Sequence, residues 1–301
     1  MTACRVSFSV ASLHVTFLRS MLSYGIYISV VPPTPNPAEQ IIPPETKYPP
    51  PDQMNTLSVV VITYNEERKL HRCLTPVNWA EELVVIDSYS TDHTVEIAKS
   101  FTKNVYQREW SGFADQRNFG IEKVSGDWIL FLDADEYVTS ALRDRIRRMM
   151  SEGQDFDAYK IHRLEHFLQF PIRHGTLNPS YQPRLLRKGK GSWTGGAHAH
   201  IELCGQGELG LIHEDLYHDS HNTLFDFISR INQYTSVDAG ERVLAEKRAG
   251  KWRMILSPLG MAWKCYIVKR GYKDGFPGLI FSLCMGIYSF LRLVKVWKQE
   301  T

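Results

Sequence analysis

Residues 126–136 read Gly-Asp-Trp-Ile-Leu-Phe-Leu-Asp-Ala-Asp-Glu, a short apolar run that ends in acidic residues. The five apolar residues from Trp128 to Leu132 are too few for a membrane span and suit a strand that is buried on both faces of a parallel sheet. Asp133 and Asp135 follow at the point where this strand must end. Because ligands bind at the carboxyl ends of strands in open α/β sheets, the stretch predicts a ligand site there.

Asp133 and Asp135 have the chemistry of a divalent-cation site. Residues two positions apart in an extended strand point to the same side, so the two carboxylates can act together. Carboxylate oxygens are the ligands that Mg²⁺ and Mn²⁺ prefer, and such an ion can neutralise a diphosphate. A lone Asp-x-Asp is more often a solvated acidic turn. The motifs upstream favour the metal site.

Apolar strand patterns alternate with helical patterns around this stretch. We expect strands at residues 57–62, 83–86, 105–106, 128–132 and 159–163. We expect helices around residues 70–73 and at 94–101, 114–124, 139–150 and 224–244. This alternation predicts an α/β fold with a Rossmann-like, mostly parallel sheet and helices on both sides. No Gly-x-Gly-x-x-Gly or Walker lysine motif follows the first four strands, which excludes the usual dinucleotide and triphosphate fingerprints.

Composition predicts three regions in this chain of 301 residues. Hydrophobic residues make up 43% of it, enough to bury a sizeable core, which excludes global disorder. Nine prolines in residues 32–52 predict an extended linker. We therefore expect a poorly ordered extension at residues 1–53, a catalytic domain at 54–240 and a basic, aromatic helical region at 241–301. Five scattered cysteines predict reduced thiols in a cytosolic compartment.

The last sixty residues are strongly basic. From Arg242 onward there are twelve basic residues and three acidic ones, which indicates an anionic partner. The run from Phe276 to Leu291 is free of charge but shorter than the roughly 20 residues that a spanning helix needs. An interfacial helix fits this pattern better, with a helix packed on the catalytic domain as the alternative. The pattern favours attachment to an anionic membrane surface.

Four segments follow one another at a recognisable spacing. Residues 58–67 read Ser-Val-Val-Val-Ile-Thr-Tyr-Asn-Glu-Glu, and residues 85–94 read Val-Ile-Asp-Ser-Tyr-Ser-Thr-Asp-His-Thr. Residues 116–120 read Gln-Arg-Asn-Phe-Gly, and residues 131–136 read Phe-Leu-Asp-Ala-Asp-Glu. Together they resemble the successive motifs of glycosyltransferase family 2. Segments 173–175, 181–191 and 270–279 are similar to a bacterial subgroup of that family, the lipopolysaccharide inner-core β-1,4-glucosyltransferases.

The resemblance implies a GT-A fold, a UDP-sugar donor, a Mg²⁺ or Mn²⁺ ion and an inverting single displacement. It assigns Asp135 as the main metal ligand and Asp133 as a contact to ribose or metal. It also implies a nucleotide pocket lined by Tyr64, Glu66, Asp87 and Arg117. Asp87 is expected to contact the uracil. The family usually has Asp-Gly after this aspartate, where the present chain has Ser88-Tyr89.

Transfer from a diphosphate needs positive charge on the leaving group and a base for the acceptor hydroxyl. Arg184 or Arg187 can supply bidentate contacts to phosphate. The related subgroup has a His-Glu pair where this chain reads His198-Ala199, so the histidine is kept and the glutamate is replaced. The candidates for the base are therefore His198, Glu202, Glu214 and Asp215. His218 is a candidate for a further metal or diphosphate ligand.

The first hypothesis is transfer of a hexose, glucose from UDP-glucose, to a heptose of the lipopolysaccharide core at the cytoplasmic face of the bacterial inner membrane. A polyprenyl phosphate or another lipid-linked glycan is the alternative acceptor. A nucleotidyltransferase would need a Gly-rich, Lys/Arg-containing loop after the first strand, where this chain has residues 63–67, Thr-Tyr-Asn-Glu-Glu. A nucleic-acid partner is not expected, because the C-terminal aromatics cluster in apolar runs rather than interleaving with the basic residues.

Overall fold

The computed structural model describes residues 55–152, 154–196, 199–205, 207–221, 223–244 and 251–300. The extension predicted at residues 1–53 and the candidate base His198 therefore lie outside the described residues. All described residues belong to one unit, Thr46–Thr301.

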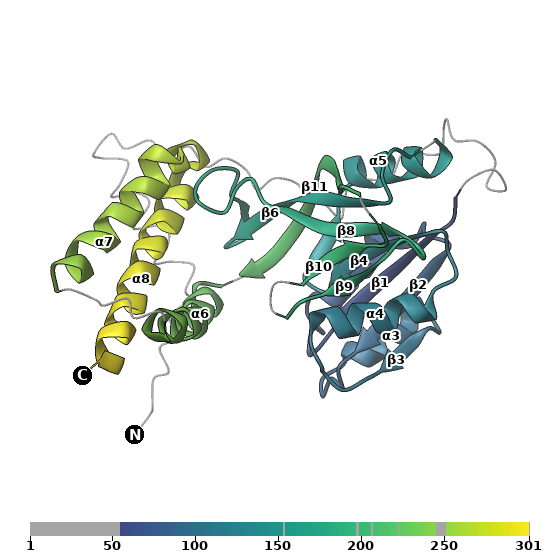
Figure 1. Ribbon diagram of the computed structural model, residues 1–301, viewed down its shortest axis with the longest axis horizontal. Helices are drawn as coiled ribbons and strands as arrows, with labels where there is room; N and C mark the ends of the chain where they lie inside the picture. Colours follow the sequence, from purple (N-terminus) through teal and green to yellow (C-terminus); the bar gives the residue numbers. More distant parts are fainter. Residues whose placement is uncertain are drawn as a thin grey trace, which may run out of the picture. The chain divides into compact units, whose positions relative to one another are not determined.

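The first half of the main sheet is parallel, as predicted. Its strands are β1 Leu57–Thr63, β2 Glu82–Asp87, β3 Val105–Gln107 and β4 Trp128–Asp133. They are arranged β3-β2-β1-β4 and all run the same way (Figure 1). The helices between them are α2 Leu70–Leu74, α3 Thr94–Phe101 and α4 Phe113–Lys123, and α5 Ser140–Ser151 follows the short strand β5 Glu136–Val138. The carboxyl ends of β1, β2 and β4 therefore meet at one edge.

Beyond β4 the sheet becomes mixed and continues in the order β8-β6-β11-β5. These strands are β8 Tyr181–Arg187, β6 Ala158–Phe167, β11 Gly210–His221 and β5 Glu136–Val138. β8 runs antiparallel to both β4 and β6, while β11 is parallel to β6 and antiparallel to β5. The short β7, Phe170–Pro171, pairs with β6. β9 Gly191–Thr194 and β10 His200–Leu203 form a separate hairpin-like pair.

Helices cover both faces of the sheet, which confirms the predicted class. Alternate residues of β1 face opposite ways, so Val59 and Val61 join one buried cluster and Val60 and Ile62 join the other. The first cluster contains residues of α2, α3 and α5, and the second contains Ala114 of α4. α4 approaches β1 closely, because a Cβ on Gly120 would lie 2.4 Å from Val60 Cγ1.

The last third of the chain is helical. Its elements are α6 Leu224–Leu244, α7 Lys251–Trp263, the π-helical turn η4 Lys264–Val268, the short η5 Gly271–Asp274, and α8 Gly275–Glu300. Phe227 of α6 and Phe281 of α8 pack on Phe167 of β6, so this group is joined to the sheet through buried aromatic contacts. The predicted domain boundary at residue 240 falls inside α6. The described cysteines, Cys73, Cys204, Cys265 and Cys284, are free, as expected of reduced thiols.

The helix over Gly271–Lys298 is long and apolar enough to cross a membrane by length and composition, although 39% of its most apolar window is buried inside the protein. This helix is longer than the charge-free run read from the sequence, because it also includes Lys273 and Asp274 at its start and Arg292, Lys295 and Lys298 near its end. A single helix of this kind is weak support for a membrane span.

Candidate active site

The loops after β1 and β2 are fastened to each other by hydrogen bonds. The backbone N–H of Asn65 donates to Ser90 Oγ at 2.9 Å, and the N–H of Thr91 donates to Asn65 Oδ1 at 2.8 Å. Asn65 and Tyr89 both have left-handed backbone conformations, with φ of 53° and 59°. Tyr64 and Tyr89 remain more than half exposed beside these loops. The arrangement leaves two aromatic rings available to a planar ligand.

Asp87 ends β2 and is fully buried. Its Oδ2 accepts from the Ser90 backbone N–H at 2.9 Å and from Gln107 Nε2 at 3.1 Å, and Ser90 Oγ donates to its Oδ1. The carboxylate thus anchors the loop that contains Ser88 and Tyr89. Its expected contact with uracil stays a prediction.

Glu66 lies between the β1 loop and the acidic cluster of β4. Its backbone N–H donates to Thr94 Oγ1 at 2.8 Å, and its carboxylate lies 3.3 Å from Lys69 Nζ. Burial raises the pKa of Glu66 by more than the nearby Lys69 lowers it. Glu66 therefore occupies the expected edge of the sheet, beside Asp135.

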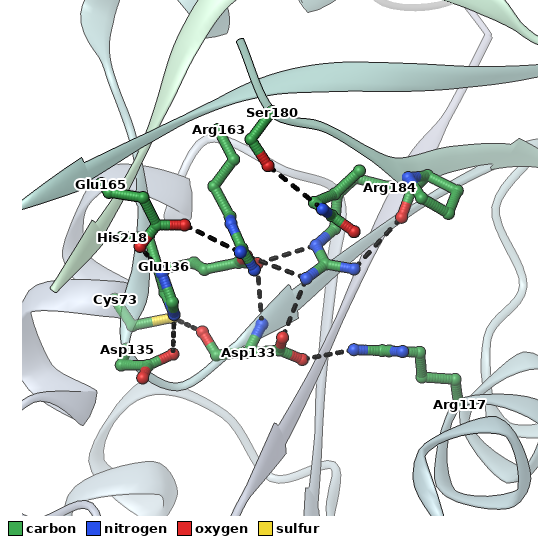
Figure 2. A network of polar contacts seen from close by, with 12 residues as sticks. Cys73, Arg117, Asp133, Asp135, Glu136, Arg163, Glu165, Ser180, Arg184 and His218 are labelled. Atoms are coloured by element: carbon green, nitrogen blue, oxygen red, sulfur yellow. Dashed lines mark hydrogen bonds and ion pairs between the residues drawn. The ribbon is translucent and has the colours of Figure 1, made fainter. Parts of the chain in front are cut away.

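Each carboxylate oxygen of Asp133 accepts a hydrogen bond from an arginine (Figure 2). Arg117 Nη2 of α4 donates to Oδ1 at 2.6 Å, and Arg184 Nη2 of β8 donates to Oδ2 at 2.8 Å. Burial alone would raise the pKa of Asp133, but the charges of Arg184 and Arg117 outweigh it and leave this pKa below its ordinary value. Asp133 is therefore ionised and neutralised from within the protein.

Arg184 is also bound to Glu136, whose side chain is fully buried. Its Nε and Nη2 donate to the two oxygens of Glu136, each at 2.8 Å. Burial lowers the pKa of Arg184, but Glu136 and Asp133 raise it further, to above its ordinary value. The structure thus brings Arg184 into the site, with its donors directed at two carboxylates instead of at solvent.

Asp135 faces His218 of β11. His218 Nε2 lies 3.4 Å from Asp135 Oδ1, and His218 Nδ1 lies 2.6 Å from Oε2 of Glu165 on β6. Burial lowers the pKa of His218, but the two carboxylates outweigh this and raise it to about 10. Asp135 Oδ2 also lies 4.0 Å from Lys69 Nζ and 3.9 Å from Arg230 of α6. Asp135 is therefore a carboxylate with cationic groups on several sides.

The described residues hold no group of three His, Cys, Asp or Glu side chains that could bind a metal ion alone. Mg²⁺ is commonly held by one or two carboxylates together with substrate phosphates, so two protein ligands suffice for a substrate-bridged ion. Asp135 supplies a carboxylate, and His218, which is in contact with it, can supply an imidazole once the ion displaces the proton from its Nε2. The donor set fits an ion whose remaining ligands come from a diphosphate. Asp133 fits less directly, since both its oxygens already accept from arginine.

Arg187 and Asp215 are not brought to this cluster. Arg187 pairs in register with Trp128, at the opposite end of β4 from Asp133, and its guanidinium lies 3.3 Å from Asp157. Because β8 is antiparallel to β4, only Arg184 reaches the acidic end. Asp215 precedes His218 by three residues in β11, so its side chain lies on the other sheet face. There its oxygens contact His162 at 2.8 Å and Arg173 at 3.1 Å.

Glu202 is exposed on β10, beside the buried Ile201. Glu214 lies at the irregularity of β11 between Ile212 and Asp215. The β9–β10 pair is nevertheless linked to the site. Trp193 of β9 lies under the Arg117 guanidinium, at 4.4 Å from Cζ to the ring centroid, and its backbone exchanges two hydrogen bonds of 2.8 Å with the Asn118 side chain.

Sequence reasoning missed Glu136, Arg163 and Glu165 as members of the site. Arg163 Nη2 donates to Glu165 Oε1 at 2.7 Å, and Glu165 in turn holds His218. The strand predicted at residues 159–163 ended too early to include Glu165, although alternation continued to residue 167 would have placed Arg163 and Glu165 on one face. Nothing in the sequence indicated which partner Glu136 would have.

Comparisons with known proteins agree with the geometry. The model of the Glycosyl transferase family 2 matches residues 58–200. The lipopolysaccharide core biosynthesis glycosyltransferase LpsC of Rhizobium meliloti (strain 1021) is 25% identical over 251 residues, which cover 81% of this chain and 93% of LpsC. An uncharacterized glycosyltransferase of Rickettsia felis is 29% identical over 259 residues, covering 81% of this chain and 90% of the relative.

Among solved structures, S. aureus TarS 1-349 in complex with UDP-GlcNAc is 14% identical, with a TM-score of 0.40 and coverage of 81% of this chain and 91% of that one. The domain at residues 58–200 of this chain belongs to glycosyl transferase family 2.

Proposed function

We propose that this protein transfers glucose from UDP-glucose to a heptose of the lipopolysaccharide core, with inversion at the anomeric carbon. The observation that carries the proposal is the cluster at the end of β4, where Asp135 is ionised beside His218 and within 4.0 Å of Lys69. The choice of acceptor is supported by the similarity to LpsC, whose name assigns it to lipopolysaccharide core biosynthesis.

The donor nucleotide would lie at the carboxyl ends of β1, β2 and β4. Tyr64 would offer its exposed ring to the nucleotide, Asp87 would fix the loop beside the base, and Glu66 would line the pocket. Arg117 is stacked on Trp193 and paired with Asp133, so it is held rigidly at the diphosphate end of the pocket. Arg184 acts as a positioning residue for Asp133, and Arg187 has no part in the pocket.

Asp135 and His218 would hold the Mg²⁺ or Mn²⁺ ion, and Asp133 would contact either the ribose or the ion. When bound, the ion supplies positive charge to the diphosphate leaving group. Lys69 and Arg230 add fixed positive charge beside Asp135, which stabilises an anionic leaving group in the same way.

The displacement itself needs a base. The acceptor hydroxyl oxygen attacks the anomeric carbon, the bond to the β-phosphate oxygen breaks, UDP leaves, and the hydroxyl proton passes to the base. We assign this role to the segment around β10, with Glu202 and His198 as the two candidates. Asp215 is the weaker candidate, because both its oxygens contact His162 and Arg173 on the far sheet face.

We propose that the reaction takes place at the cytoplasmic face of the bacterial inner membrane, with the protein attached peripherally. The basic, apolar helices after residue 250 support this location.

The test is UDP release from a panel of UDP-sugars with Mg²⁺ or Mn²⁺ and a deep-core lipopolysaccharide acceptor. We expect turnover with UDP-glucose only when acceptor and metal are both present, and loss of turnover in Asp135→Ala. Asp155→Ala changes an exposed aspartate of the α5–β6 loop and is the matched control. Turnover with polyprenyl phosphate in place of the core acceptor would support the alternative acceptor. Full activity of Asp135→Ala would refute the site.

A further inference from the structure

Helix α7 exposes a row of large apolar side chains along one face. The row consists of Trp252, Ile255, Leu256, Leu259 and Trp263, each between 58% and 77% exposed. Their spacing of three, one, three and four residues is that of a single helical stripe. We call these five residues the α7 row. A tryptophan stands at each end of it.

The α7 row is not the face by which the helix is attached to the protein. The opposite side of α7 packs on α8, where Ser257 Oγ lies 2.9 Å from Ser289 Oγ. A Cβ on Gly286 would lie 2.9 Å from the carbonyl oxygen of Pro258, so the two helices cross closely there. Met254 packs against Leu293 and Val296. One face of α7 is thus packed on α8, and the α7 row is a second apolar face that remains exposed.

The chain segment that carries the α7 row and continues to η5 is basic. Between residues 251 and 274 the chain has six basic residues, Lys251, Arg253, Lys264, Lys269, Arg270 and Lys273, and one acidic residue, Asp274. Asp274 is used internally, since it accepts from the His174 backbone N–H at 2.8 Å and lies 2.7 Å from His174 Nδ1. The partner must therefore be apolar at its centre and anionic around it, which is the chemistry of an anionic lipid bilayer. Tryptophans at the two ends suit the headgroup boundary.

The alternative, in which α8 crosses the membrane, conflicts with its contacts to α6. Lys295 Nζ donates to Asn232 Oδ1 and Thr235 Oγ1, each at 2.8 Å, and Arg292 lies 3.7 Å from Asp238. α6 exposes polar side chains such as Asn232 and Gln233 on the same turns. A spanning α8 would carry this polar helix into the hydrocarbon, where exposed polar groups are costly. Contact along the surface is compatible with α6, and penetration is not.

We propose that the α7 row is the surface by which this protein lies on an anionic bilayer, with α7 parallel to the membrane plane and α8 behind it. These residues would hold the enzyme at the membrane where it meets a lipid-linked acceptor. In this respect the inference rests on the proposed function. The membrane contact that the sequence predicts at Phe276–Leu291 of α8 is therefore reassigned to the exposed face of α7.

The test is co-sedimentation of the full chain with vesicles of phosphatidylcholine, with and without phosphatidylglycerol. The first variant is Ile255→Gln/Leu256→Gln/Leu259→Gln, and its matched control is Leu211→Gln, an exposed leucine at the start of β11. The second variant is Lys264→Glu/Lys273→Glu, with Lys99→Glu of α3 as its control. We expect the wild type to sediment with the anionic vesicles, and both variants to bind about tenfold or more weakly. We expect added salt to weaken binding of the wild type and both controls.

Three outcomes would overturn the inference: no binding of the wild type to either vesicle, undiminished binding of the triple variant, or a dimer that the triple variant dissociates in the absence of lipid. The last result would assign the α7 row to a second copy of this chain. UDP release with a deacylated, soluble acceptor separates the two proposals. Normal release without vesicle binding refutes only the membrane surface, whereas vesicle binding without turnover of any UDP-sugar refutes only the proposed reaction.

Discussion

Arg184 Nη2 donates to Asp133 Oδ2 at 2.8 Å, which joins the antiparallel strand β8 to the catalytic end of β4. The same guanidinium holds both oxygens of the buried Glu136. Removing Arg184 would therefore leave the buried Glu136 without its main partner. It would leave Asp133 paired with Arg117 alone. The role of this residue is to fix the acidic turn in place, and its substitution should affect stability before it affects substrate binding.

Arg184→Met should lower the free energy of unfolding by about 3–5 kcal/mol, since breaking a buried ion pair leaves an uncompensated charge. Arg187→Met should cost only about 0–1 kcal/mol, because its pair with Asp157 is 38% and 40% exposed. Urea unfolding of the two variants measures the difference. Equal losses of unfolding free energy would mean that the buried ion pairs of Glu136 contribute no more stability than the exposed Arg187–Asp157 pair.

Glu165→Gln should weaken Mn²⁺ binding by about 10- to 100-fold, because Glu165 orients His218 through the 2.6 Å contact at Nδ1. Calorimetric titration of Mn²⁺ into the protein saturated with UDP would measure this directly. Glu208→Gln, at an exposed glutamate between β10 and β11, serves as the control. An unchanged affinity in Glu165→Gln would show that His218 does not bind the ion.

Gly120→Ala should destabilise the protein by about 1–3 kcal/mol, since the added methyl group would lie 2.4 Å from Val60 Cγ1 and push α4 off β1. Gly240→Ala, in the interior of α6 with no atom within 4 Å of the new Cβ, should stabilise it by about 0.5–1 kcal/mol. Thermal unfolding of both variants measures whether each substitution raises or lowers the stability. A stabilised Gly120→Ala would mean that the α4–β1 contact relaxes freely.

Asn118→Ala should cost about 1–3 kcal/mol, because the Trp193 backbone would lose both its partners. It should also raise the KM for the UDP-sugar more than it lowers kcat, since Trp193 supports Arg117 from below. Steady-state UDP release at varied donor concentration separates the two effects. Asn78→Ala, at an exposed residue after η3, should leave KM unchanged.

The parallel half of the sheet and the edge where Asp87, Asp133 and Asp135 lie could be predicted from the sequence. Their strands are short apolar runs, and the helices between them have regular spacing, so local pattern and final structure coincide there. β11 was not predictable in this way. It has charged or histidine side chains at five of the seven positions from His213 to Asp219 and two register irregularities, and it exists because neighbouring strands pair with it.

The partners within the site could not be predicted for the same reason. Arg184 and Arg187 have the same chemistry, and only the antiparallel register of β8 against β4 decides which of them reaches Asp133. Likewise, Asp215 and His218 differ by an odd number of positions in one strand, so pairing with β6 places them on opposite faces. Sequence spacing alone cannot select between such residues until the neighbouring strand is known.

The burial of Glu136 constrains the order in which the domain can fold during synthesis. Glu136 is made before its partners, Arg163 and Arg184, which follow it by 27 and 48 positions. While the ribosome is still adding those residues, the segment that follows β4 carries a carboxylate that has no cation to bury against. We expect that a nascent chain ending after α5 stays open at this edge, and that the domain closes only when β8 has emerged.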